Sequence, residues 1–202
     1  MPFSLYEITV PVFIHGLKTL SHLLDVGTEQ VKFDGESKLI TSRLVEDQGD
    51  LVFQVQKASD AARLLVVRLV KFDGESKLIT SRLVEDQGDL VFQVQKASDA
   101  ARLLVVRLGK VESATFANDE ATFEQLHARI SETIKFLESV DPKQIDQAES
   151  DIIEWNGQKL IGSAYAVQFA IPNFYFHLTT AYSILRKDGV QIGKADFLGK
   201  KN

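Results

Sequence analysis

One histidine in the last third of the chain has neighbours that could support chemistry. His177 shares a helical face with Phe174, Ala181 and Ile184, and Asn173 lies one turn earlier. An imidazole in an apolar setting could act as a general base or as a metal ligand, because burial lowers its pKa. The alternative is a core histidine bonded to a hydroxyl or a backbone carbonyl, which we favour because only one imidazole faces this core. The hydroxyl groups nearby in the sequence belong to Tyr165, Thr179, Thr180 and Tyr182.

The same segment is rich in aromatic residues. Phe169, Phe174, Tyr175 and Phe176 form a cluster that is typical of a hydrophobic core, and the alternative is the lining of a small-ligand pocket. The candidate pocket residues are Asn173, Phe174, His177, Phe169 and Tyr182.

The remaining histidines and the acidic clusters indicate structural roles. His15 and His22 lie two helical turns apart, about 10 Å along an axis, which is too far for one ion to be chelated directly. His127 stands among charged residues and suggests no chemistry. No glycine-rich phosphate loop or Ser-His-Asp order is present. The carboxylates that we expect to cap the repeated helices are Glu46, Asp47 and Asp50, and again Glu85, Asp86 and Asp89.

Composition narrows the class of protein. A chain of 202 residues with 45% hydrophobic residues can form one domain with a real core, so we expect a single domain over residues 1–202. A net charge of −5 argues against a nucleic-acid partner or an anionic membrane surface. The absence of cysteine excludes disulfides, thiolate metal sites and a cysteine nucleophile, and it fits a reducing compartment. No apolar stretch reaches the roughly 18 to 20 residues of a membrane span, so we predict a cytoplasmic protein.

A tandem repeat dominates the first half of the chain. Residues 31–69 and 70–108 are identical at every position. Old repeats diverge at exposed positions, so this identity indicates a duplication that is very young, engineered or an assembly error. We expect the bundle to have room for only one copy, so the chain carries one copy more than the fold can use.

The spacing of apolar residues predicts helices in the N-terminal half. One helix runs from about 5 to 25, begins at a capping box formed by Ser4 and Glu7, and ends at Gly27. Each repeat copy holds a short helical turn, near residues 37–44 in the first copy, followed by a longer helix with a coiled-coil-like seam. The seam residues are Leu51, Val55, Ala58, Ala62, Leu65 and Leu69 in the first copy, and Leu90, Val94, Ala97, Ala101, Leu104 and Leu108 in the second.

The pattern beyond the repeat predicts a helix and a hairpin. The helix covers about residues 120–140, opens at Asn118 or Asp119, and ends before Pro142. Asn156-Gly157 between two short apolar runs is a strong signal for a two-residue hairpin turn.

A last helix completes the expected fold. It covers about residues 163–187, with a kink or break at Pro172, and an irregular tail from 190 to 202 covers the bundle. Four main helices with short connections predict an all-α, antiparallel four-helix bundle with a small β-hairpin before the last helix. The spare copy adds an extra helix that docks on its own bundle or on a neighbour's, which would give a homodimer.

Several segments resemble a known family. They are SLYEITVPVF at 4–13, PNFYFHLTTAYSILR at 172–186 and DGVQIGKADFLG at 188–199. Weaker similarity runs through SRLVEDQGDLVFQVQKASDAARLL and TFEQLHARISETIKFLES. The chain resembles an uncharacterised helical family, a domain of unknown function, within the DinB-like superfamily. The resemblance implies a DinB-like bundle.

That superfamily often binds a divalent metal through three histidines, one on the second helix and a His-x-x-x-His pair on the fourth. Here His177 is followed four residues later by Ala181, and neither repeat copy contains a histidine. Because this chain departs from the three-histidine pattern, we predict no cofactor and do not expect a divalent metal. Our preferred hypothesis is a non-catalytic helical module, engineered or otherwise duplicated. The alternatives are a degenerate DinB-like metal- or thiol-dependent enzyme that uses His177, and a small-ligand binder.

Overall fold

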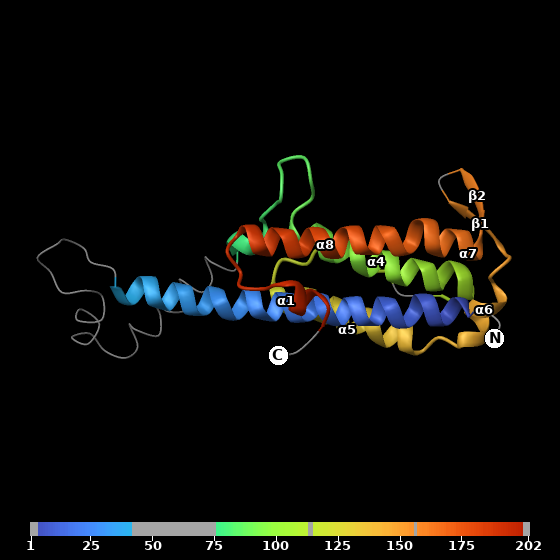
Figure 1. Ribbon diagram of the computed structural model, residues 1–202, viewed down its shortest axis with the longest axis horizontal. Helices are drawn as coiled ribbons and strands as arrows, with labels where there is room; N and C mark the ends of the chain where they lie inside the picture. The colour runs from blue at the N-terminus through green and yellow to red at the C-terminus, as the bar shows by residue number, and fades with distance from the viewer. Residues whose placement is uncertain (1–3, 42–75, 113–114, 156, 200–202) are drawn as a thin grey trace, which may run out of the picture.

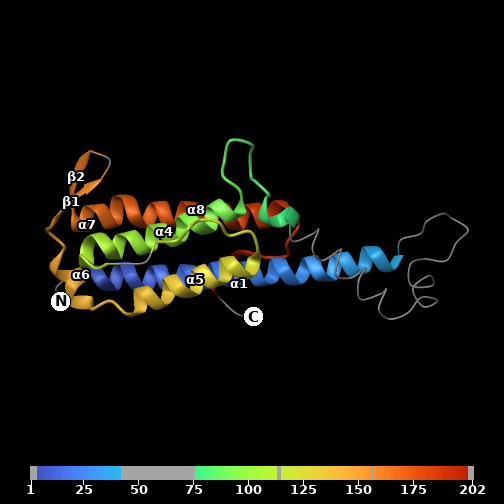
Figure 2. The same cartoon turned by 180° about the vertical axis from the view of Figure 1, so that it is seen from behind.

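Long helices aligned along one axis make up most of the part of the chain that the structure describes (Figures 1 and 2). The structure, a computed structural model, describes residues 4–41, 76–112, 115–155 and 157–199. The long helices are α1 (Leu5–Thr41), α4 (Leu90–Gly109), α5 (Phe123–Glu138) and α8 (Ile171–Lys187), and α1 and α4 each pack against both α5 and α8. The shorter elements are α6 (Pro142–Gln147), strands β1 (Ile152–Trp155) and β2 (Gln158–Ile161), α7 (Gly162–Ala164), the π-helical turn η1 (Tyr165–Ala170) and α9 (Lys194–Phe197).

The start of α1 is capped from two directions. The Ser4 hydroxyl accepts a hydrogen bond from the Glu7 backbone N–H at 3.1 Å, which confirms Ser4 as the N-cap of the expected capping box. Asp146, in α6, accepts from the Tyr6 backbone N–H at 2.9 Å and from the Ser4 hydroxyl at 2.9 Å. A carboxylate at a helix N-terminus is stabilising because it faces free N–H groups and the positive end of the helix dipole.

The predicted end of this helix at Gly27 is wrong, because α1 continues to Thr41. A Cβ at Gly27 would lie 3.3 Å from the Leu185 side chain and 3.8 Å from that of Leu78. Glycine at this position therefore allows close packing and does not terminate the helix. Residues 31–41, which begin the first repeat copy, extend α1 beyond the end of the neighbouring helices (Figure 1).

The second repeat copy supplies the core helix α4. Asp89 begins it by accepting a hydrogen bond from the Phe92 backbone N–H at 2.9 Å, as expected of this carboxylate. The helix ends at Gly109, followed by Lys110 in the left-handed conformation. Every predicted seam residue of this copy is buried, and burial of each Leu or Val side chain contributes about 1.5 to 3 kcal/mol. The seam of the first copy and its carboxylates lie outside the described residues.

Helix α5 begins later than the sequence pattern predicts. Thr122 is its N-cap, and Gln125 completes a capping box with bonds of 3.2 Å and 3.1 Å. Asn118 has a φ of 59° and lies in the connection before the helix. The expected end of the helix before Pro142 is confirmed.

The predicted hairpin is confirmed. β1 pairs antiparallel with β2, and the register places Trp155 opposite Gln158. Gly157 has a φ of 75°, a conformation that glycine adopts without strain. The Trp155 ring lies 3.7 Å from the Phe169 ring, between their centroids, so the hairpin packs against the π-helical turn.

Pro172 does not break the last helix. Residues 162–187 form one helical run, in which the Ile171 N–H bonds to the Ala166 carbonyl across a π-helical turn. The tail is more ordered than expected, because α9 interrupts it and Val190 and Ile192 are buried. Among the described residues, no helix has both the length and the hydropathy needed to cross a membrane.

Candidate functional site

His177 is a buried histidine held by a side chain of the repeated helix. Its Nδ1 lies 2.8 Å from the Gln93 Oε1, and the Gln93 Nε2 donates to the Gly88 carbonyl at 2.8 Å. Because that carbonyl can only accept, Gln93 must present its oxygen to His177, so Nδ1 carries the proton. The partner is thus an amide from α4, and not one of the hydroxyl or backbone groups expected from the sequence.

The surroundings of His177 disfavour its charged form. The side chain is 8% exposed, and burial lowers its pKa to about 4, with a further contribution from the positive charge of Lys96. The rings of Phe92 and Phe176 contact it edge-on at 6.1 Å and 5.3 Å between centroids. At neutral pH the imidazole is therefore neutral and is flanked by two aromatic rings.

This depressed pKa makes stability depend on pH. Between the ordinary pKa of 6.5 and about 4, the unfolded chain binds a proton at His177 that the folded chain does not. The free energy of unfolding should therefore fall as the pH falls through this window, by about 3 kcal/mol in total. We expect His177→Gln to remove this contribution, which urea denaturation at a series of pH values would measure.

The exposed residue His15 provides the control. His15→Gln makes the same substitution at an exposed histidine, so the change in the His177→Gln profile is compared with the change that it causes. Carboxylates also titrate in this range. The free energy of unfolding of each variant is therefore compared with that of the unmodified protein at every pH. A His177→Gln profile that runs parallel to the unmodified one would contradict the assignment.

The other residues of the predicted pocket lie at separate places along the last helical run. Phe169 stacks on Trp155 at the hairpin end. Phe174 is fully buried, 4.9 Å from Phe13 between ring centroids. Tyr182 packs against Phe197 of α9 at 5.5 Å, while Asn173 is half-buried one turn before His177. The structure thus does not gather the five residues into one cavity.

Two of the other histidines, His22 and His127, contact acidic groups. His22 pairs with Asp196 at 3.1 Å, which ties α9 to α1, and the carboxyl of Asp196 also accepts from the Gly193 N–H. His127 contacts Asp25 at 3.2 Å and the Ser21 hydroxyl at 2.9 Å. Within the part of the chain that the structure describes, no three His, Cys, Asp or Glu side chains lie close enough together to hold a metal ion.

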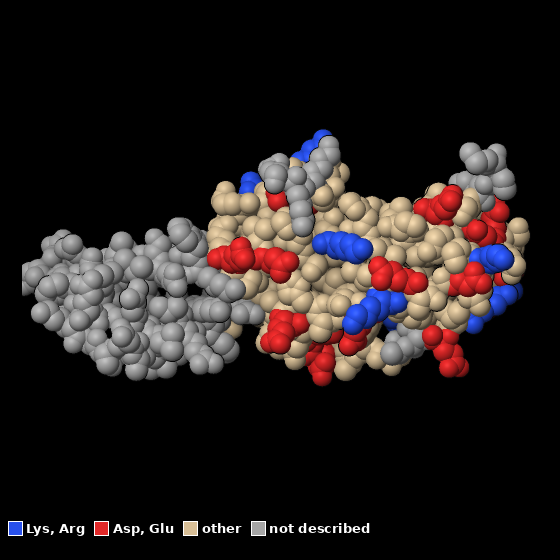
Figure 3. Space-filling view, turned by 90° about the horizontal axis from the view of Figure 1, so that it is seen from below, with Lys and Arg blue, Asp and Glu red and all other residues tan. Residues whose placement is uncertain are grey.

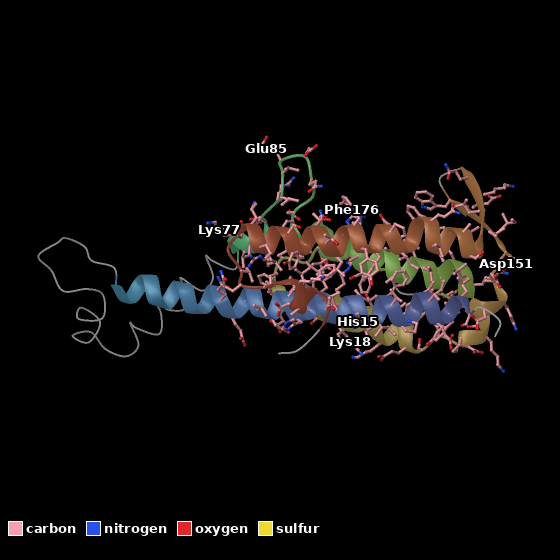
Figure 4. All side chains as sticks on the ribbon, viewed as in Figure 1. His15, Lys18, Lys77, Glu85, Asp151 and Phe176 are labelled. Carbon is pink, nitrogen blue, oxygen red and sulfur yellow. The ribbon has the colours of Figure 1, made fainter. Side chains whose placement is uncertain are left out.

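A cleft of about 620 Å³ lies elsewhere, beside the first turns of α4. Three segments form it: residues 76–82, residues 88–95, and the connection that leads to α5. The neighbouring loop projects from the molecule with Glu85 near its tip, as Figures 1 and 4 show. A hydrogen bond of 3.0 Å from the Leu90 N–H to the Ser81 carbonyl closes the base of this loop. The lining residues are Ser76, Ile79, Thr80, Arg82, Gly88, Asp89, Val91, Phe92, Gln95, Asn118, Glu120 and Ala121.

A buried ion-pair network lies directly behind this cleft. The Arg129 side chain is 1% exposed and donates to Asp99 at 2.9 Å and to Glu120 at 2.8 Å. It also donates to the Asn118 side-chain oxygen at 2.9 Å and to the Gln95 backbone carbonyl at 3.3 Å. Such a buried cation is stable only because several acceptors surround it.

Glu120 connects the network to the cleft. Burial alone would raise its pKa, but hydrogen bonds from Arg129 and Gln95 hold the pKa below its ordinary value, so the carboxylate is ionised at neutral pH. Its second oxygen accepts from the Gln95 Nε2 at 2.8 Å. Gln95 is buried and Asp99 is half-buried.

Sequence reasoning missed this network, although one signal was present. Arg129 falls on the apolar stripe of α5 with Leu126, Ile130 and Leu137, all of which are buried. A charged residue on a buried stripe requires partners, and here they come from α4 and from the connection before α5.

Known proteins share this helical fold. The chain is similar to a DinB family member protein from Shewanella denitrificans, with 32% sequence identity, a TM-score of 0.67, and coverage of 96% of this chain and 92% of that one. Residues 5–76 and again 70–198 match the domain of unknown function DUF1993, so the chain belongs to that family. A search of curated proteins finds no match.

The residues present do not fit the three-histidine metal site of the wider superfamily. Gln93 faces His177 from α4, and Ala181 occupies the position one turn after His177. A neutral amide oxygen and a methyl group cannot replace two imidazole ligands for a transition metal.

Proposed function

We propose that this protein is a small-ligand-binding module whose site is the cleft beside α4. The observation that carries the proposal is the convergence of polar side chains from three segments on a cleft of about 620 Å³, with the buried Arg129 network behind it. Ligand sites typically combine such a volume with apolar walls and a few fixed polar groups. Acidic and basic side chains are interspersed over the face shown in Figure 3.

The proposal includes the arrangement of the chain. The fold is a DinB-like antiparallel four-helix bundle made of α1, α4, α5 and the helical run that ends in α8. The second repeat copy supplies the core helix of this bundle. The first copy supplies an extra helix that docks on its own bundle or on that of a second chain, and light scattering distinguishes these two states. Identity at exposed positions such as Lys77 and Glu85 supports a recent or engineered duplication.

A second candidate is a degenerate DinB-like enzyme. The bond from His177 on the last helix to Gln93 on α4 favours it, because a proton held on Nδ1 leaves the Nε2 of His177 free to act as a base. Stoichiometric zinc, nickel or iron in the purified protein would support this candidate over the binding module.

Titration with small rings tests the binding proposal. In ¹H–¹⁵N spectra we expect benzyl alcohol, nicotinamide, indole or 1-methyluracil to shift the backbone signals of Phe92, Gln95 and Asn118. Ala121→Trp should abolish these shifts, because an indole placed on this exposed cleft wall would fill the site. If no compound of the panel perturbs the cleft, the proposal is wrong.

A further inference from the structure

We infer that the cleft recognises an uncharged planar ring through an amide-like edge, in which a hydrogen-bond acceptor stands beside an N–H donor, as in uracil. The inference rests on the proposed function and names the ligand class of the same site. It follows from two amide side chains of the lining, Asn118 and Gln95, whose orientations are both fixed by their partners.

Asn118 presents a donor to the cleft. Its Oδ1 accepts from the Arg129 Nη1 at 2.9 Å, and a guanidinium can only donate, so the oxygen must face inward. The Nδ2 group, with its two N–H bonds, is the other arm of this exposed side chain, which lines the cleft.

Gln95 presents an acceptor. Its Nε2 donates to Glu120 at 2.8 Å, and that carboxylate is ionised and can only accept. The Oε1 of Gln95 is therefore the atom left for a ligand. Because Arg129 holds the Gln95 backbone, Asn118 and Glu120 together, donor and acceptor are in place before a ligand binds. Such preorganisation reduces the entropy lost on binding.

The remaining walls favour a flat, uncharged partner. The Phe92 side chain is 40% exposed, with Lys96 5.3 Å from its ring centroid, and provides an apolar surface. The Glu120 carboxylate is paired with Arg129, so the Asp89 carboxylate is the lining charge that repels anions, while the Nη1 of Arg82 donates to carbonyls of its own loop at 3.2 Å and 3.4 Å. A ring without a phosphate therefore suits the site better than a nucleotide.

Two ligands that differ by one methyl group test the donor–acceptor edge. In ¹H–¹⁵N titrations, 1-methyluracil should shift the side-chain amide signals of Gln95 and Asn118. 1,3-Dimethyluracil, whose N3 carries no proton, should bind about ten-fold more weakly or worse, because one hydrogen bond is lost. Uridine 5′-monophosphate should also bind more weakly than 1-methyluracil.

Two variants test the protein side. Asn118→Asp keeps an oxygen for Arg129 and tolerates the φ of 59°, but it removes the donor, so 1-methyluracil should bind about ten-fold more weakly at unchanged thermal stability. Gln95→Met should weaken binding to a similar extent, whereas Gln56→Met, the same change in the other repeat copy, should leave it unchanged.

The outcomes separate the two proposals. Equal binding of 1-methyluracil, 1,3-dimethyluracil and benzyl alcohol would overturn the ligand class and leave the binding module standing. Tighter binding of the nucleotide, or unchanged binding to Asn118→Asp, would also overturn the ligand class. If no ring binds, both proposals are wrong.

Discussion

Replacement of Arg129 by methionine is expected to lower the free energy of unfolding by about 3 to 5 kcal/mol. Methionine has a similar length and no charge, so the change leaves Asp99 and Glu120 without their main cation. Their side chains are only 18% and 10% exposed, so water cannot fully replace the guanidinium. Urea denaturation at pH 7, followed by circular dichroism, would measure the loss.

A surface ion pair provides the control for Arg129. Lys18 lies 3.8 Å from Glu138, and both side chains are more than half exposed. Lys18→Met should therefore change stability by less than about 1 kcal/mol. If Arg129→Met proves no more harmful than Lys18→Met, the buried network does not stabilise the fold.

Leu104→Ala, in the second repeat copy, should cost about 2 to 5 kcal/mol of stability. Leu104 is fully buried in α4, and its truncation removes apolar contacts and leaves a cavity in the core. The same change in the first copy, Leu65→Ala, should reduce stability much less if the second copy is the one that occupies the core. Since the two positions have the same sequence surroundings, the comparison isolates the effect of location.

Exchange between the copies would give a different pattern. If either copy can occupy the core, each single variant can place its intact copy there, and both single variants should lose little stability. The double variant Leu65→Ala/Leu104→Ala would then show the full cost. Equal losses in the single variants, together with a much larger loss in the double variant, would contradict a fixed assignment.

Local signals in the sequence predicted much of the fold. Asn156-Gly157 predicted the hairpin, and the spacing from Leu90 to Leu108 predicted the buried face of α4. The errors arose where tertiary contacts override a local preference. Gly27 is a helix stop by its residue type, but here it permits close packing against Leu185.

The candidate site was harder to predict than the helices. The acceptors around Arg129 come from α4 and from the connection that begins near Asn118, and no local spacing indicates that these segments meet. The apolar residues on its helical face identified His177 as a candidate, but its partner Gln93 is 84 positions away in the sequence. Side-chain networks of this kind depend on which helices become neighbours, and periodicity within one helix contains no such information.

Because α1 is one continuous helix, labels attached along it have known spacings. The helix is still bonded to Gly189 and Gln191 through the Gln30 side chain and then remains helical to Thr41, so each further residue moves a probe about 1.5 Å along the helix axis. Spin labels or dyes placed at successive turns between residues 31 and 41 would report their distance from a partner label beside the cleft. The start of the first repeat copy thus provides positions for labels that are separate from the residues of the cleft.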